Sequence, residues 1–127
     1  MRTIRPTLEE FRTLAATHPI VPVWAEVLAD LETPVSVFAK IVGEGNGFLF
    51  ESVEHGERWS RFSFVGRNPS ARLVLRNGTI TVTGTLPDGV PTDRGILSAM
   101  EALLRIYDAP MFPDLPPLQS GLVGYVG

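Results

Sequence analysis

Side chains able to do acid–base or metal chemistry are few in this sequence. Its two histidines, His18 and His55, are too far apart to form a metal-ligand motif, and there is no cysteine. His18 follows a predicted helix, where a basic side chain complements the last backbone carbonyls. The sequence has no nucleophile elbow, phosphate-binding loop or dinucleotide fingerprint. We therefore predict no catalytic residue and no metal site in this chain.

A group of carboxylates around residue 51 is the one polar cluster that needs an explanation. Glu54 and Glu57 belong to a predicted loop, so with Glu51 they do not converge as a magnesium site requires. Glu51 falls among apolar neighbours of a predicted strand, where a half-buried carboxylate needs a partner. That partner is either Arg61 across a hairpin or the ammonium group of a bound ligand.

A small amino acid is the ligand that this cluster would suit. Such a ligand needs an acceptor for its ammonium group, polar contacts for its carboxylate and an apolar slot for its side chain. Glu51 and Ser52 could supply the polar contacts, and Phe48, Phe50 and Phe64 could form the slot. The residues alone leave the structural and the ligand-binding explanations open.

The strands that would position this cluster are predicted from alternation and turn residues. Residues 48–53 form a short strand, and residues 61–65 are its partner beyond a polar hairpin tip. Asn77-Gly78 joins residues 71–76 to 79–83 and is typical of a two-residue type I′ turn. Residues 20–28 contain Pro22 and suit an edge strand. The chain closes with a further strand-like run at 120–127.

Three helices are predicted around these strands. Thr7 opens a capping box for a helix over 7–17, and Thr33-Pro34 starts a short helix through Ile41. Thr92-Asp93 is predicted to cap a third helix, whose apolar residues fall at helical spacing up to Tyr107. The fold class is therefore α+β, a mainly antiparallel sheet with helices packed on one side.

Composition limits the possible partners. With 127 residues and 44% hydrophobic residues, the chain is long enough for one domain with a core. A net charge of -3 and the lack of long basic runs disfavour nucleic acid binding. No stretch reaches the length of a membrane span or a signal core, so we expect no membrane association and a cytoplasmic location.

Three segments together resemble a known family. Phe48–Glu54 followed by Glu57–Gly66 is similar to the anthranilate synthase component I family, and residues 21–41 and 121–127 resemble the segments that flank this motif. The resemblance implies that residues 1–127 are an amino-terminal regulatory and scaffold domain. It also implies that the chain is a fragment of a larger two-layer chorismate-utilising fold, whose catalytic chorismate-binding domain is absent.

The resemblance implies a function for the polar cluster. The family makes anthranilate from chorismate with magnesium, using ammonia from a glutamine amidotransferase subunit. Its L-L-E-S motif belongs to the feedback site for L-tryptophan, and Phe50, Glu51 and Ser52 match it, with Phe50 in place of a leucine. Arg61 and Ser63 match an R-Y-S pattern and are possible supporting residues. We expect this chain to be catalytically inert, to hold no cofactor and to bind tryptophan weakly at most.

Two other functions remain open at this stage. Aminodeoxychorismate synthase component I and isochorismate-type synthases share the fold, so the product of the longer protein is undecided. The chain could instead be an interaction domain that self-associates as a homo-oligomer through an exposed strand edge at 120–127.

Overall fold

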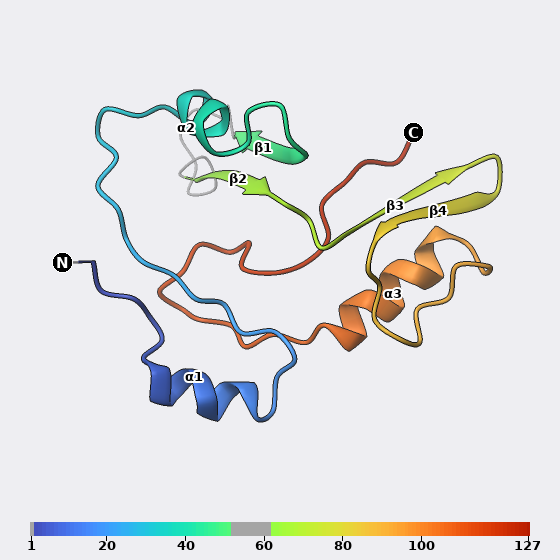
Figure 1. The fold of residues 1–127 in the computed structure, drawn as a ribbon, viewed down its shortest axis with the longest axis horizontal. Helices are drawn as coiled ribbons and strands as arrows, with labels where there is room; N and C mark the ends of the chain where they lie inside the picture. The colour runs from blue at the N-terminus through green and yellow to red at the C-terminus, as the bar shows by residue number, and fades with distance from the viewer. Residues whose placement is uncertain (1, 52–61) are drawn as a thin grey trace. The chain divides into compact units, whose positions relative to one another are not determined.

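The computed structural model describes residues 2–51 and 62–127 (Figure 1). The chain divides into two compact units. One unit comprises Met1–Val27 and Ser70–Gly127, and the other is Leu28–Pro69. Within the described residues there are three helices and two antiparallel two-stranded ribbons. The α+β class is confirmed, and its antiparallel strands form two separate ribbons.

Helix α1 (Leu8–Ala15) begins with the predicted capping box. The Glu10 backbone N–H donates to Thr7 Oγ1 at 3.3 Å, and the Thr7 backbone N–H donates to Glu10 Oε2 at 2.7 Å. At the other end, His18 Nδ1 lies 3.2 Å from the carbonyl oxygen of Leu14. The structural interpretation of His18 at a helix end is thus confirmed.

The edge strand predicted at residues 20–28 is wrong. A single antiparallel bridge is found there, in which Arg5 and Trp24 exchange two backbone hydrogen bonds of 2.8 Å. Pro22 has no N–H to extend the ladder. None of the described strands pairs with this segment. Trp24 instead packs on Phe112 with ring centroids 4.6 Å apart, and Phe112 exchanges two hydrogen bonds of 2.8 Å with the Gln119 amide.

Strands β3 (Ala71–Arg76) and β4 (Thr79–Gly84) form the predicted hairpin. The turn residues Asn77 and Gly78 have φ of 50° and 78°, as a type I′ turn requires. One face of this ribbon is apolar and the other carries arginines, threonines and one valine. The apolar face is Leu73, Leu75, Ile80 and Val82, and the other is Arg72, Val74, Arg76, Thr79, Thr81 and Thr83.

Helix α3 (Ile96–Ile106) holds the buried hydrophobic side chains of the described residues, which are Ala99, Ala102 and Leu103. The predicted cap at Thr92-Asp93 is wrong. The helix starts after Gly95, whose φ of 86° turns the chain and whose position offers no capping side chain.

The strand-like run at 120–127 does not form a strand. Its described residues have no regular structure and are exposed, with Tyr125 at 96% of its full accessibility. No described strand pairs with it, so its backbone has no ladder to join.

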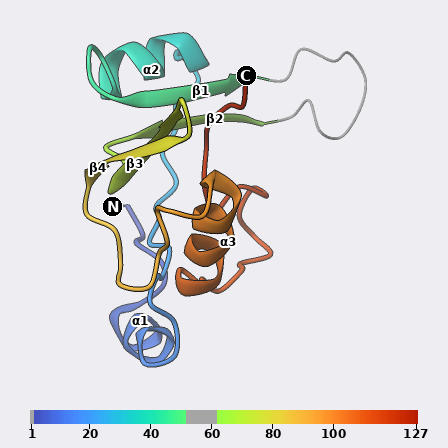
Figure 2. The ribbon, with the colours of Figure 1, turned by 90° about the vertical axis from the view of Figure 1, so that its right-hand side faces the viewer.

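The second unit contains α2 (Pro34–Ile41), β1 (Gly47–Glu51) and β2 (Ser63–Arg67). Helix α2 has the predicted bounds, with Thr33 as its N-cap and Pro34 at the first helical position. Gly43, with φ of 58°, ends the helix in the left-handed conformation and donates to the Phe38 carbonyl at 3.2 Å. Helix α2 runs along the β1–β2 ribbon (Figure 2).

Candidate functional site

Three of the predicted site residues, Phe50, Glu51 and Ser63, lie at the end of the β1–β2 ribbon where β1 finishes and β2 begins. The antiparallel register pairs Phe50 with Phe64 and Glu51 with Ser63. Ser52, predicted to bind tryptophan, and Arg61, predicted to support the site, lie outside the described residues. Ser63 is the residue directly across from Glu51 in the register.

One face of the ribbon is aromatic, and we call it the phenyl face: Phe48, Phe50, Phe64 and Gly66. Side chains of paired residues share a face, and strand residues alternate between faces. The Phe48 and Phe50 ring centroids are 5.1 Å apart, and Phe62 extends the row at 6.3 Å from Phe64. The three phenylalanines that were predicted to form a ligand slot, Phe48, Phe50 and Phe64, thus share one face of the ribbon.

Gly66 leaves room for the Phe48 ring on the phenyl face. A Cβ at Gly66 would lie 2.1 Å from Cε1 of Phe48, so the Phe48 ring occupies the space that a side chain would need. Gly66 pairs directly with Phe48 across the ribbon. A glycine in a strand is expected where another group approaches this closely.

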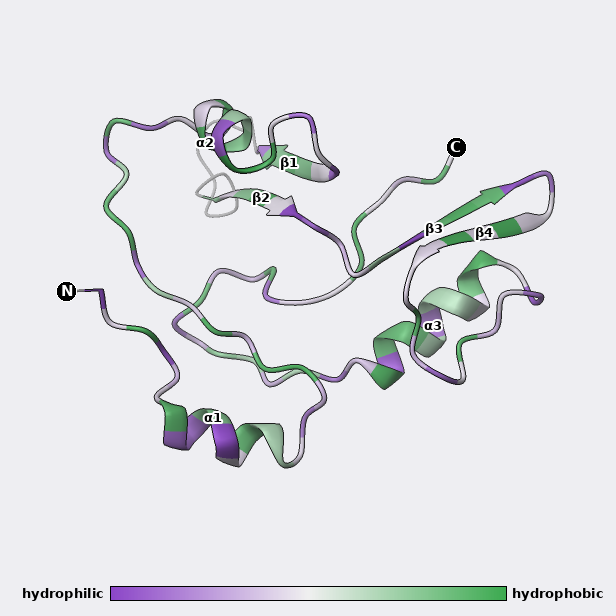
Figure 3. Cartoon of the chain, viewed as in Figure 1, coloured by the Kyte–Doolittle hydropathy of each residue, from purple (hydrophilic) through white to green (hydrophobic). Residues whose placement is uncertain are grey.

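The opposite face of the ribbon lies under α2. A Cβ at Gly47 would lie 2.6 Å from a methyl group of Val42, the residue that caps α2. Leu49 and Val65 share this face with Gly47 and are half-buried. Both faces of the ribbon thus carry apolar side chains, although Glu51, Ser63 and Arg67 also lie on the face of Leu49 and Val65. Figure 3 colours β1 and β2 by the hydropathy of each residue, with a hydrophilic end of β2.

Glu51 differs from the expectation that it would be half-buried. Its side chain is exposed, and no residue in the described part of the chain donates a hydrogen bond to it. Glu51 is the last residue of β1.

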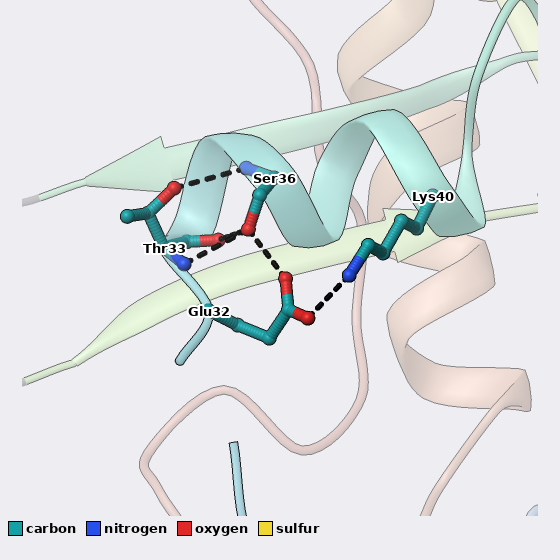
Figure 4. A network of polar contacts seen from close by, with 4 residues as sticks. All are labelled: Glu32, Thr33, Ser36 and Lys40. Carbon is teal, nitrogen blue, oxygen red and sulfur yellow. Dashed lines mark hydrogen bonds and ion pairs between the residues drawn. The ribbon is translucent and has the colours of Figure 1, made fainter. Parts of the chain in front are cut away.

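A polar network that sequence reasoning missed fixes α2 (Figure 4). The Ser36 hydroxyl donates to Glu32 Oε2 at 2.6 Å, and the Lys40 ammonium group donates to the other carboxylate oxygen. Thr33 and Ser36 also cap each other's backbone N–H groups, at 2.9 and 3.1 Å. The bonds from Lys40 and Ser36 lower the pKa of Glu32. The signal in the sequence was Lys40, the chain's one lysine, eight residues after an acidic residue.

The described residues do not fit a magnesium site. They contain no group of three histidine or acidic side chains that could hold a metal ion. Glu54 and Glu57 lie outside the described part of the chain. Among the helices that the structure describes, none combines the length and apolar character needed to span a membrane.

Comparison with known proteins gives the family. No protein-family model matches the chain. Anthranilate synthase component 1 of Mycolicibacterium smegmatis is 43% identical over 118 residues, which is 92% of this chain and 22% of that protein. The Arthrobacter globiformis protein of the same name is 42% identical over 98% of the chain, and that of Pseudomonas aeruginosa is 40% identical over 94%.

These relatives are much longer than the chain. The chain spans 22 to 25% of the length of the relatives it matches. The similarity nevertheless runs through both units and is not confined to the ribbon that carries the site. By its sequence, this chain belongs to the anthranilate synthase component 1 family.

Proposed function

We propose that this chain is the amino-terminal, regulatory part of an anthranilate synthase component 1 subunit and carries a feedback site for L-tryptophan. The observation that carries the proposal is the β1–β2 register, which gathers Phe50, Glu51 and Ser63 at one ribbon end. These residues belong to the segments whose sequence resembles the family's feedback motif. The names of the relatives support the same family.

The chemistry of the ribbon end suits a free amino acid with an aromatic side chain. The exposed Glu51 carboxylate is an acceptor for an ammonium group, and a charge-assisted bond of this kind is stronger than a neutral one. Phe50, 46% exposed, lies next to Glu51 on the opposite face of β1 and offers an apolar surface at the same ribbon end for an indole ring. We assign the carboxylate of the ligand to the hydroxyl of Ser52, with Arg61 and Ser63 in support.

Regulation then requires two states of the longer protein. Tryptophan inhibits only if it binds the inactive arrangement more tightly than the active one. We assign the conversion of chorismate to anthranilate, the magnesium ion and the contact with a glutamine amidotransferase subunit to the remainder of the polypeptide. On this proposal the chain alone is inert, and the subunit acts in the cytoplasm.

The test of the site uses the longer protein that contains this segment. Ser52→Phe should abolish inhibition by tryptophan and leave the uninhibited rate within twofold, because the added ring fills the slot. Glu51→Gln should raise the half-inhibiting concentration about tenfold, since a hydrogen bond to a charged group contributes roughly 1.5–3 kcal/mol. Ser120→Phe, the same change at an exposed position of the other unit, is the matched control and should leave inhibition intact.

Two outcomes would contradict this proposal. Unchanged inhibition in Ser52→Phe would remove Ser52 from the site. Product identification separates the related reactions, since anthranilate and aminodeoxychorismate are chemically distinct. Aminodeoxychorismate as the product would overturn the assigned reaction.

A further inference from the structure

Helix α2 and strand β1 run in opposite directions within the unit Leu28–Pro69. A turn at residues 42–46 joins them, and Val42 at the end of the helix packs against Gly47 at the start of the strand. With a rise of about 1.5 Å per helical residue, the eight residues of α2 span about 12 Å, and the strand from Gly47 to Glu51 spans about 14 Å. The first turn of α2 is therefore level with Glu51.

The polar residues of the candidate site lie on the face of the ribbon that α2 packs on. Strand residues alternate between faces, so Glu51 shares a face with Gly47 and Leu49. Ser63 pairs with Glu51 and lies on the same face. Figures 2 and 4 show the beginning of α2 at the end of the ribbon toward which β1 points. The start of the helix and the pair of Glu51 and Ser63 thus lie at one end of this unit.

A single carboxylate ties the start of α2 to its last turn. Glu32 lies directly before the N-cap Thr33 and accepts hydrogen bonds from the Ser36 hydroxyl, at 2.6 Å, and from the ammonium group of Lys40 in the last turn. Ser36 also accepts from the Thr33 backbone N–H at 2.9 Å. Because Glu32 is bound to two turns of the helix, these side chains fix the direction in which the chain enters α2.

We propose that the ion pair of Glu32 with Lys40, together with the Ser36 hydroxyl, positions the first turn of α2 beside Glu51 and Ser63 and thereby sets the affinity for L-tryptophan. The three residues act through the helix and do not touch the ligand. A site binds more tightly when its elements are already held in the bound arrangement. The inference rests on the feedback site proposed above.

The test measures inhibition by L-tryptophan in the longer protein that contains this segment. Glu32→Gln and Lys40→Met should each raise the half-inhibiting concentration about threefold, a small effect because the ion pair is partly exposed. The double variant should raise it no further, because both changes break the same pair. The uninhibited kcat and the KM for chorismate should stay within twofold, which separates positioning of the site from damage to the whole subunit.

Two further variants serve as controls. Lys40→Arg keeps the cation and should be inhibited like the unchanged protein. Arg12→Met makes the change matched to Lys40→Met, since Arg12 is the basic residue in the last turn of α1 in the other unit, and it should leave inhibition unaltered. Circular dichroism checks that each variant keeps its secondary structure.

Failure of this inference can be distinguished from failure of the proposed function. Unchanged inhibition in both Glu32→Gln and Lys40→Met, alongside loss of inhibition in Ser52→Phe, would overturn this inference alone. Unchanged inhibition in Ser52→Phe as well would overturn both. A change in kcat or KM as large as the change in inhibition would also overturn the inference, because the network would then support the whole subunit.

Discussion

The β3–β4 and β1–β2 ribbons have the same antiparallel architecture but depend on different interactions. The first is closed by a two-residue turn, and the second by a segment of eleven residues, 52–62, between its strands. The buried hydrophobic side chains of the described residues lie in the unit that contains β3–β4. The unit that contains β1–β2 has none in its described part, although its ribbon carries more aromatic surface.

This difference shows which ribbon is stabilised by its own short-range interactions. A ribbon with a local turn and a largely polar outer face is specified by short-range interactions. A ribbon with one fully apolar face and a long connection depends more on what packs on it. The candidate site lies at the end of the second kind of ribbon. The conformation of a ribbon that depends on what packs on it can change when a ligand binds. A regulatory site requires such a change.

The largest expected effect contrasts the two units by core truncation. Leu103, 3% exposed, should cost about 3 kcal/mol when changed to alanine, as buried leucines do. Leu49→Ala in β1 should cost about 1 kcal/mol, because that side chain is half-buried. Urea unfolding followed by circular dichroism measures both. Equal costs would mean that the β1–β2 unit has a core of its own.

Two strand glycines provide the next comparison. A Cβ at Gly84 would lie 2.4 Å from the Ser70 backbone oxygen at a φ of +88°, so Gly84→Ala should cost about 2 kcal/mol. Gly66→Ala meets the Phe48 ring, which can rotate away, and should cost about 1 kcal/mol. Thermal unfolding would detect both. A larger loss at Gly66 would show that the phenyl face is rigid even in the isolated chain.

The turn of the β3–β4 ribbon can be tested on its own. Gly78→Ala should cost about 1 kcal/mol, because an alanine is strained at φ of +78° although nothing lies within 4 Å of its Cβ. Gly124 has equally open surroundings without a positive φ, so Gly124→Ala is the control and should leave the melting temperature unchanged. If neither change altered the melting temperature, the turn conformation would not determine the stability of this ribbon.

The smallest effect concerns the network on α2. The folded-state pKa of Glu32 is below its ordinary value of 4.5, so its carboxylate stabilises the fold above that pH. This contribution is lost as the pH falls through the folded-state pKa. Glu32→Gln should therefore lower the melting temperature slightly at pH 7 and not at pH 3, and Lys40→Met should do the same. A difference that persists at pH 3 would exclude the ionised carboxylate as its cause.

Much of the local structure could be predicted because it depends on neighbours in the sequence. The capping box at Thr7, the helix after Thr33 and the Asn77-Gly78 turn were all predicted and found. The site residues Phe50 and Glu51 were predicted from a resemblance together with strand alternation. Each of these features involves groups within a few residues of one another, where backbone preference and short hydrogen bonds dominate.

Features that depend on distant partners were decided by the tertiary structure. Of two strand-like segments, 20–28 forms a single bridge to Arg5 and 120–127 pairs with no described strand, because strand propensity cannot supply the other half of a ladder. The exposure of Glu51 and its pairing with Ser63 followed from the register and from the end of β1. The sequence alone determined the short-range elements and the chemistry of the side chains. Tertiary structure decided which apolar faces are covered, because burial depends on residues far apart in the chain.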